Sequence, residues 1–194
     1  MRHLLSGAVE ALAATAEKRD PYTAGHQRRV AALACAIAKK MGLNVNRIDA
    51  LRIASILHDI GKMYIPTEIL SKPGRLTEVE MLLVRTHCQA GSDIVKKIPF
   101  YEPIAQFLLQ HHERLDGSGY PQGLKGPEIL LEARILGVAD VVEAMASHRP
   151  YRPALGVTKA LEEITANSGI LYDPEVVRLV VSYLRRKVLS LLTF

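Results

Sequence analysis

Apolar residues recur at helical spacing along most of the chain, and no stretch alternates apolar and polar residues as a half-buried strand does. In segment 23–41, Val30 and Ile37 share one helix face with His26. The second half of segment 46–59 is apolar nearly all round, which is typical of a central buried helix. The pattern predicts helices at 8–18, 23–41, 46–59, from 77 through His87, at 101–112, from 126 through Asp140, and from 173 onward.

Local signals mark several helix boundaries. Thr77 and Glu80 form a capping-box sequence, which opens a helix. Asp173 and Pro174 suit the N-cap and first position of the last helix. Segment 116–123 holds too many glycines to be helical. Because no strand pattern, repeat or low-complexity linker interrupts the chain, we predict an all-α fold in one domain, residues 1–194.

Length and composition narrow the class of protein. The 194 residues can bury a sizeable core, and 48% of them are apolar. No apolar run approaches the roughly 18–20 residues of a membrane span, and the first residues lack the apolar core of a secretory signal. The two cysteines show no CxxC spacing, which favours a reducing compartment. We therefore predict a cytoplasmic protein with no membrane partner.

The two cysteines have different neighbours. Cys35 lies in an alanine-rich apolar stretch, 31–38, and we expect a free buried thiol there. Cys88 follows His87 directly, but a single thiolate among imidazoles and carboxylates is an unusual ligand. Cys88 is therefore left out of the predicted site.

The net charge of +5 suits a polyanionic partner such as a nucleic acid or a nucleotide. Lysines and arginines are nevertheless spread along the chain, and no basic block is longer than 185–187. We therefore expect no nucleic-acid partner, and individual cations near a site carry more information than the overall sign.

Histidines and aspartates form the main chemical pattern. They recur at near-regular intervals, about one helix and its connection apart, so that each helix can deliver one or two of them inward. Adjacent helical residues point about 100° apart, so an adjacent pair can serve one site only at a helix end or a kink. Both adjacent pairs do lie at predicted helix ends. The set is His26, His58, Asp59, His87, His111, His112 and Asp140.

These seven side chains can surround two divalent metal ions. The carboxylate of Asp59 has two oxygens and can bridge two cations. Nitrogen and oxygen donors without thiolate favour iron, manganese or nickel over a structural zinc site. Two such ions roughly 3.5–4 Å apart hold a hydroxide between them and neutralise phosphoryl charge during in-line displacement. Lys62, one turn beyond Asp59, is placed to contact the phosphate.

Three motifs resemble one family. They are His-Asp-Ile-Gly-Lys at 58–62, His-His-Glu-Arg-Leu-Asp-Gly-Ser-Gly-Tyr-Pro at 111–121, and Arg-Pro-Tyr-Arg at 149–152. Together they are similar to the HD-GYP family of cyclic di-GMP phosphodiesterases, and the resemblance covers most of the chain. It implies an all-α HD-domain helical bundle, with the glycine-rich GYP loop at the rim of the active site. It also implies metal-dependent hydrolysis of cyclic di-GMP to linear pGpG or on to GMP.

The resemblance also implies residue roles. The seven histidines and aspartates become ligands of two divalent ions, with iron or manganese expected first and nickel, cobalt, zinc or magnesium as alternatives. Asp59 and Lys62 become the catalytic pair, with Lys62 touching the scissile phosphate. Arginine suits the binding of phosphate or guanine because its planar fork makes two hydrogen bonds at once. The implied substrate contacts are Asp20, Lys62, Gly119, Tyr120, Pro121, Arg149 and Arg152.

One position departs from the family pattern. Some members hold a third metal with a glutamate four residues before the first ligand histidine, where this chain has Tyr22. A neutral phenol with a pKa near 10 is a poor ligand at neutral pH, so we expect two metals and pGpG as the main product. Family members usually carry a receiver or sensory domain upstream, so we expect either a stand-alone enzyme or a fragment.

The sequence leaves several alternatives open. One is a catalytically silent HD-GYP module that binds cyclic di-GMP or, through its GYP loop, a diguanylate cyclase domain. Another is an enzyme for 3′,3′-cyclic GMP-AMP or a nucleoside phosphate, because residues that grip phosphate are indifferent to the base. The presence of all seven ligands and Lys62 favours activity. A homodimer is compatible with the sequence, and the native metal stays open.

Overall fold

The computed structural model describes residues 2–17, 25–100, 102–147 and 154–191. The described part is helical throughout and contains two isolated β-bridges but no strand, so the predicted all-α fold is confirmed. The elements in order are α1 (Arg2–Glu17), α2 (His26–Lys40), α3 (Val45–Leu57), the 3₁₀ helix η2 (Ile60–Tyr64), α4 (Thr67–Leu70), α5 (Glu78–Arg85), α6 (His87–Val95), α7 (Ile104–Gln110), the 3₁₀ helix η3 (Gly126–Glu128), α8 (Leu131–Ala146), α9 (Val157–Ala166) and α10 (Pro174–Leu191).

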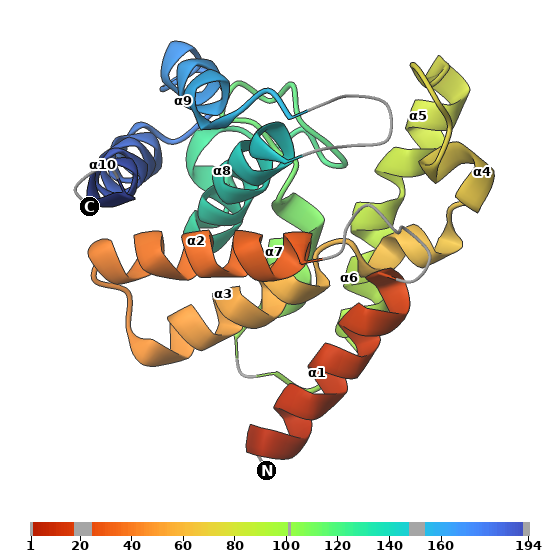
Figure 1. Cartoon of the computed structure of the whole chain (residues 1–194). Coiled ribbons are helices and arrows are strands. Elements are labelled where there is room, and N and C mark those ends of the chain that lie inside the picture. Colours follow the sequence, from red (N-terminus) through yellow and green to blue (C-terminus); the bar gives the residue numbers. More distant parts are fainter. Residues whose placement is uncertain (1, 18–24, 101, 148–153, 192–194) are drawn as a thin grey trace.

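The core lies between α2, α3, α7 and α8. Helix α2 packs against α3 and α8, and α7 packs against α3, α6 and α8 (Figure 1). The apolar positions that predicted these helices are the ones that become buried, including Ile37, Leu57, Phe107 and Leu136. Burying a side chain of this size stabilises the fold by about 1.5–3 kcal/mol. The packing of these helices therefore fixes where their ends lie relative to one another.

Two predicted helix starts are confirmed in detail. The Thr77 side chain accepts a hydrogen bond from the Glu80 backbone N–H, and the Glu80 carboxylate accepts one from the Thr77 N–H. Asp173 Oδ1 accepts hydrogen bonds from the N–H groups of the second and third residues of α10, and Pro174 is the first residue of that helix. Both caps satisfy backbone donors that have no partner within the helix.

Other predicted boundaries were wrong. The helix that opens at Thr77 stops at Arg85, and His87 begins the next helix, because Thr86 makes a turn between them. The Thr86 hydroxyl donates to the carbonyl of Leu83 and tightens this turn. Segment 126–128 is a 3₁₀ turn, and the helix that carries Asp140 begins at Leu131.

Several helices differ from their predicted lengths. Helix α1 begins at Arg2, α3 ends at Leu57, and α7 covers Ile104–Gln110. Helices α4 and α9 were not predicted. Helix α4 is only four residues long, whereas α9 does carry apolar residues at helical spacing, of which Ala160 and Ile164 are buried. The start predicted at 23 lies outside the described residues, and the described part of that helix begins at His26.

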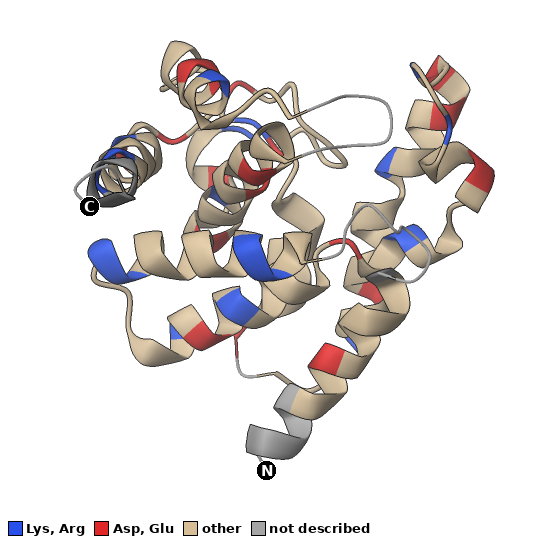
Figure 2. Cartoon of the chain, in the orientation of Figure 1, with Lys and Arg blue, Asp and Glu red and all other residues tan. Residues whose placement is uncertain are grey.

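Lysines and arginines are spread over the fold. Figure 2 shows lysine and arginine on most of the helices instead of in one block. Across the described ranges, no helix combines the length and the apolar character needed to cross a bilayer.

Cys35 is a free thiol as expected, but it is half-buried, because its position on α2 lies at the edge of the packed face.

Candidate metal centre

Six of the seven predicted ligands lie at helix ends. His26 is the first residue of α2, and His58 and Asp59 lie between α3 and η2. His87 begins α6, and His111 and His112 follow the last residue of α7. Asp140 is the exception, because it lies within α8. Both adjacent pairs therefore lie where the helix stops, as the sequence predicts.

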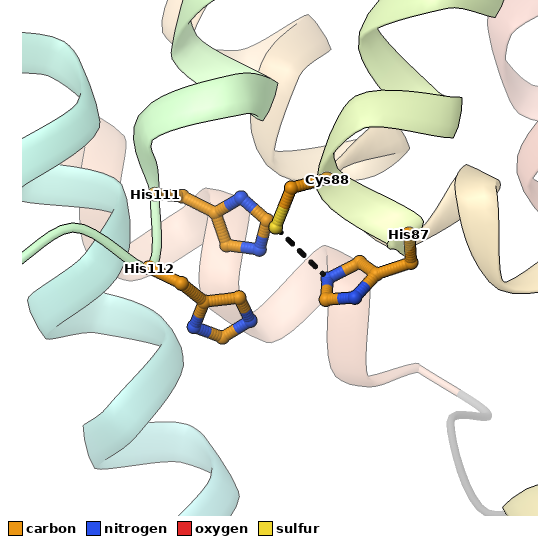
Figure 3. A group of neighbouring side chains, drawn as sticks. All are labelled: His87, Cys88, His111 and His112. Atoms are coloured by element: carbon orange, nitrogen blue, oxygen red, sulfur yellow. Dashed lines mark hydrogen bonds between the residues drawn. The ribbon is translucent and has the colours of Figure 1, made fainter. Parts of the chain in front are cut away.

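The five histidine rings form one connected cluster. Ring centroids are 5.4 Å apart for His26 and His58, and 5.3 Å apart for His58 and His111. His87 lies 5.5 Å from His111 and 5.2 Å from His112. Four of the five residues are only 1% exposed; His112 is half-buried. The fold therefore brings all five together in its interior, and Figure 3 shows three of them facing one another.

Two carboxylates complete the cluster. Asp140 Oδ1 lies 3.2 Å from His26 Nε2 and 3.7 Å from His58 Nε2. Asp59 Oδ2 lies 3.5 Å from His58 Nε2, and Asp59 Oδ1 lies 3.7 Å from His87 Nε2. The two oxygens of Asp59 thus face different histidines, which is the arrangement that a bridging carboxylate requires.

The backbone sets the direction of three rings. His58, His87 and His111 each place Nδ1 within 2.6–2.8 Å of the carbonyl oxygen three residues earlier. A ring that donates through Nδ1 keeps the lone pair of Nε2 for a metal ion. Nε2 of His58 and of His111 is buried and has no hydrogen-bond partner in the part of the chain that the structure describes. An unsatisfied buried polar atom costs about 1–3 kcal/mol, and a bound cation removes that cost.

His26 is oriented by a side chain instead. Its Nδ1 contacts Glu143 Oε2 on α8. The other oxygen of Glu143 accepts hydrogen bonds from Arg29 Nε and Ser147 Oγ, both at 2.6 Å. Sequence reasoning missed Glu143, although its spacing of three residues from Asp140 places both carboxylates on one face of α8.

The electrostatics hold most of the donors in the form that binds metal. Burial, together with the neighbouring His58 and His87, lowers the pKa of His111 to about 3. Burial would raise the pKa of Asp59, but Lys62, whose Nζ is 2.8 Å from Oδ2, and the nearby histidines hold it well below its usual range. Neutral imidazole and ionised carboxylate are the ligating forms of these groups.

The pKa of His26 shifts the other way. Burial lowers it, but the hydrogen bonds to Asp140 and Glu143 outweigh burial and raise the pKa of His26 to about 9. Near neutral pH the metal-free protein therefore holds a proton on His26, and an incoming cation must displace that proton.

Three groups of donors are close enough to hold ions. In each group, one donor atom per residue lies within 4.8 Å of every other. The groups are His26, His58 and Asp140; His58, Asp59 and His111; and His87, Cys88, His111 and His112. Every predicted ligand belongs to at least one group, and the third also contains Cys88, which the sequence argument left out.

The GYP loop reaches this cluster through Tyr120. The Tyr120 ring stacks on His112 with centroids 4.8 Å apart, and the guanidinium of Arg85 lies 5.0 Å from the centroid of the Tyr120 ring. The buried Glu113 carboxylate accepts hydrogen bonds from the N–H groups of Gln122 and Leu124 and so fixes the loop. A side chain at Gly119 would meet the backbone of Glu113 at 2.4 Å, so this close approach requires glycine.

Four predicted positions lie outside the described residues. They are Asp20, Tyr22, Arg149 and Arg152. Gly119, Tyr120 and Pro121 lie in the loop beside His112, and Lys62 contacts Asp59.

Comparisons with known proteins agree with these motifs. A family described as "HD domain" matches residues 10–176. The chain is 43% identical over 171 residues to a cyclic di-GMP phosphodiesterase of Thermotoga maritima, covering 87% of this chain and 46% of the relative. It is 42% identical over 168 residues to the cyclic di-GMP phosphodiesterase response regulator RpfG of Xanthomonas campestris, covering 86% and 44%. It is 40% identical over 167 residues to the 3′3′-cGAMP-specific phosphodiesterase 3 of Vibrio cholerae, covering 86% and 36%. The chain thus spans less than half of the length of each of these relatives.

Solved structures show the same fold at lower sequence identity. A cyclic GMP-AMP phosphodiesterase of V. cholerae matches with a TM-score of 0.68 at 20% identity, covering 91% of this chain and 48% of that one. The HD domain of the L. monocytogenes phosphodiesterase PgpH, solved with cyclic-di-AMP, matches with a TM-score of 0.66 at 21% identity, covering 95% and 98%. The chain belongs to the HD-domain family, and the resemblance to HD-GYP cyclic dinucleotide phosphodiesterases that its motifs predict is confirmed.

Proposed function

We propose that the chain is the catalytic domain of a metal-dependent phosphodiesterase that hydrolyses cyclic di-GMP. The observation that carries this proposal is a pair of buried Nε2 atoms, on His58 and His111, that have no hydrogen-bond partner among the described residues and lie within 4.8 Å of a carboxylate oxygen of Asp59. A buried nitrogen without a hydrogen-bond partner destabilises the folded protein, and a bound cation would accept its lone pair and remove that penalty.

The donors suit two divalent ions. His26, His58 and Asp140 would hold one ion, and His87, His111 and His112 would hold the other, with one oxygen of Asp59 for each. Donors that are mainly nitrogen and oxygen fit iron or manganese. Bound ions of this kind supply an activated water and neutralise charge on the phosphoryl group.

Residues around the ions would contact the substrate or shape the rim of the site. Lys62 lies beside Asp59 with 20% of its side chain exposed, so its ammonium can reach a phosphate oxygen from the solvent side. The GYP loop would form the rim of the site, with Tyr120 against His112. Asp20, Arg149 and Arg152 are proposed substrate contacts on the strength of the resemblance alone.

The substrate is a cyclic dinucleotide, with cyclic di-GMP first and 3′,3′-cyclic GMP-AMP second. Relatives of similar identity are named for each of the two substrates, which is why the second is retained. Because Tyr22 replaces the ligand of a third metal, we expect pGpG as the main product.

Product analysis tests the proposal. The chain is purified without oxygen, loaded with iron or manganese, and incubated with several cyclic dinucleotides, and the products are separated by chromatography. Asp59→Asn is the matched variant, because it removes one charge and weakens bridging at nearly constant size, so metal content and turnover should fall together. Metal-loaded protein that binds cyclic di-GMP without cleaving any of the substrates would identify a silent binding module instead.

A further inference from the structure

Cys88 lies among the donors of one metal position. Its side chain is fully buried, and Sγ lies 3.6 Å from Nε2 of His87 (Figure 3). A buried cysteine usually serves as a small apolar residue. Cys88 is buried like the core residues, but its sulfur lies within 4.8 Å of ring nitrogens of His87, His111 and His112. Its sulfur faces imidazoles instead.

The distances fit one ion. Donor atoms of His87, Cys88, His111 and His112 all lie within 4.8 Å of one another. With bonds of about 2.0–2.1 Å to nitrogen and 2.3 Å to sulfur, two donors of one tetrahedral ion are roughly 3.3–3.6 Å apart. The His87 and Cys88 donors, 3.6 Å apart, are already near this separation, and every other pair lies within 4.8 Å.

A second observation points to a cation at the same place. Nε2 of His111 is buried and has no hydrogen-bond partner among the described residues. It belongs to the same group of four donors as Sγ of Cys88. In the described part of the chain, a buried nitrogen without a hydrogen-bond partner and a buried sulfur therefore lie within 4.8 Å of each other.

We propose that Cys88 is a ligand of the ion held by His87, His111 and His112, so that this half of the centre has one sulfur donor beside its three nitrogens and the shared carboxylate of Asp59. The inference rests on the proposed function in that it places a metal ion on these histidines. The other half, on His26, His58 and Asp140, has only nitrogen and oxygen donors. The two metal positions are therefore chemically unequal.

The unequal donors have consequences for metal choice. Sulfur favours zinc, cobalt(II) or iron(II) over manganese and magnesium. Burial raises the pKa of the Cys88 thiol in the metal-free protein, so the thiol is neutral there. The incoming cation forms the metal–sulfur bond as the S–H bond breaks, and the proton passes to solvent.

Cobalt(II) loading provides a direct test, because a thiolate ligand gives cobalt an intense charge-transfer band in the near ultraviolet. Wild type, Cys88→Ser and Cys35→Ser are loaded with cobalt, and their metal content is counted. Cys35 is the only other cysteine of the chain and is the matched control. We expect the band in wild type and in Cys35→Ser and its loss in Cys88→Ser. Competition between zinc and manganese should shift toward manganese by at least tenfold in Cys88→Ser.

Two outcomes would overturn the inference: cobalt-loaded wild type without the band, or a band that survives in Cys88→Ser. If Cys88→Ser does not fold, X-ray absorption of zinc-loaded wild type decides, because sulfur at about 2.3 Å supports the ligand and a shell of nitrogen and oxygen alone contradicts it. Activity toward cyclic dinucleotides is measured on the same samples. Active protein without metal–sulfur bonding refutes only the role of Cys88, whereas a metal–sulfur bond in inactive protein refutes only the proposed function.

Discussion

Glu143→Gln separates the positioning of a metal ligand from ligation itself. The carboxylate of Glu143 contacts His26 Nδ1 through one oxygen and accepts hydrogen bonds from Arg29 and Ser147 through the other. It is nearly buried, and it fixes the His26 ring with Nε2 directed at Asp140. Glutamine keeps the length and shape of the side chain but removes the charge, and its amide nitrogen accepts no hydrogen bond.

The expected loss follows from that geometry. Removing a carboxylate that orients a metal-bound histidine costs about 10–100-fold in metal affinity, or about 1.4–2.7 kcal/mol. A second effect opposes this loss, because Glu143 is one of the groups that raise the pKa of His26 to about 9. Below that pH a proton competes with the metal in wild type, and the competition weakens once the carboxylate is gone. The deficit of the variant should therefore be largest at pH 9 and narrow as the pH falls toward 7.

The assay is zinc or cobalt affinity against a competing chelator, measured between pH 7 and pH 9, with circular dichroism as a check on folding. Arg29→Gln is the control, because it removes a half-exposed partner of Glu143 without touching His26. We expect a change of only a few-fold there, since exposed ion pairs contribute little. A folded Glu143→Gln protein with wild-type metal affinity at pH 9 would show that the carboxylate does not position His26.

Three further changes test other parts of the structure. Lys62→Ala should lower kcat by on the order of 10²–10³ while metal content is retained, because the ammonium acts on charge that develops in the transition state; a rise in KM alone would make Lys62 a binding residue. Gly61→Ala should lower the free energy of unfolding, measured by urea denaturation, by about 1–3 kcal/mol or more, because a Cβ there would lie 2.0 Å from the backbone oxygen of His87. Gly7→Ala, whose Cβ would have no neighbour within 4 Å, should not destabilise the protein. Hydrogen bonds from Lys72 and the Thr77 backbone lower the pKa of Glu80 from 4.5 to about 2, so the difference in melting temperature between wild type and Glu80→Gln should be constant above pH 4.5 and close as the pH falls toward 2; a difference that persists at pH 2 would contradict the role of the charge.

The sequence was sufficient for the fold class and for the position of the donors along the chain. Periodic apolar residues marked the helices, and the rule that adjacent residues diverge on a helix placed both His-containing pairs at helix ends. The contact between His26 and Glu143 joins residues far apart in the sequence, so only the packing of α2 against α8 reveals it. Cys88 was excluded because a lone thiolate is an unusual ligand, whereas its burial beside His87 became visible only in three dimensions.

The break in the helix at Thr86 has a chemical reason that the sequence pattern did not reveal. His58, His87 and His111 all follow the C-terminus of a helix, and each ring contacts the carbonyl three residues earlier, within the last turn of that helix. Carbonyls in a last turn lack an amide partner within the helix, so the ring satisfies one of them and in return is held with Nε2 inward. A helix that continued through residue 87 would give that carbonyl to the backbone and leave the ring without this anchor.

His26 is the first residue of α2, and its ring is held by a side chain from a different helix. Glu143, on α8, orients this ring, and because it carries a full charge it helps to raise the pKa of His26. At His87 and His111 burial outweighs the upward effect of the backbone carbonyl, and the pKa falls. The four rings thus obtain the same orientation by two routes, one local and one tertiary. The His26 ring is oriented by a side chain, which a substitution can change, whereas the rings of His58, His87 and His111 are oriented by backbone carbonyls, which a substitution leaves in place. Glu143→Gln can therefore test the orientation of a ligand without removing the ligand.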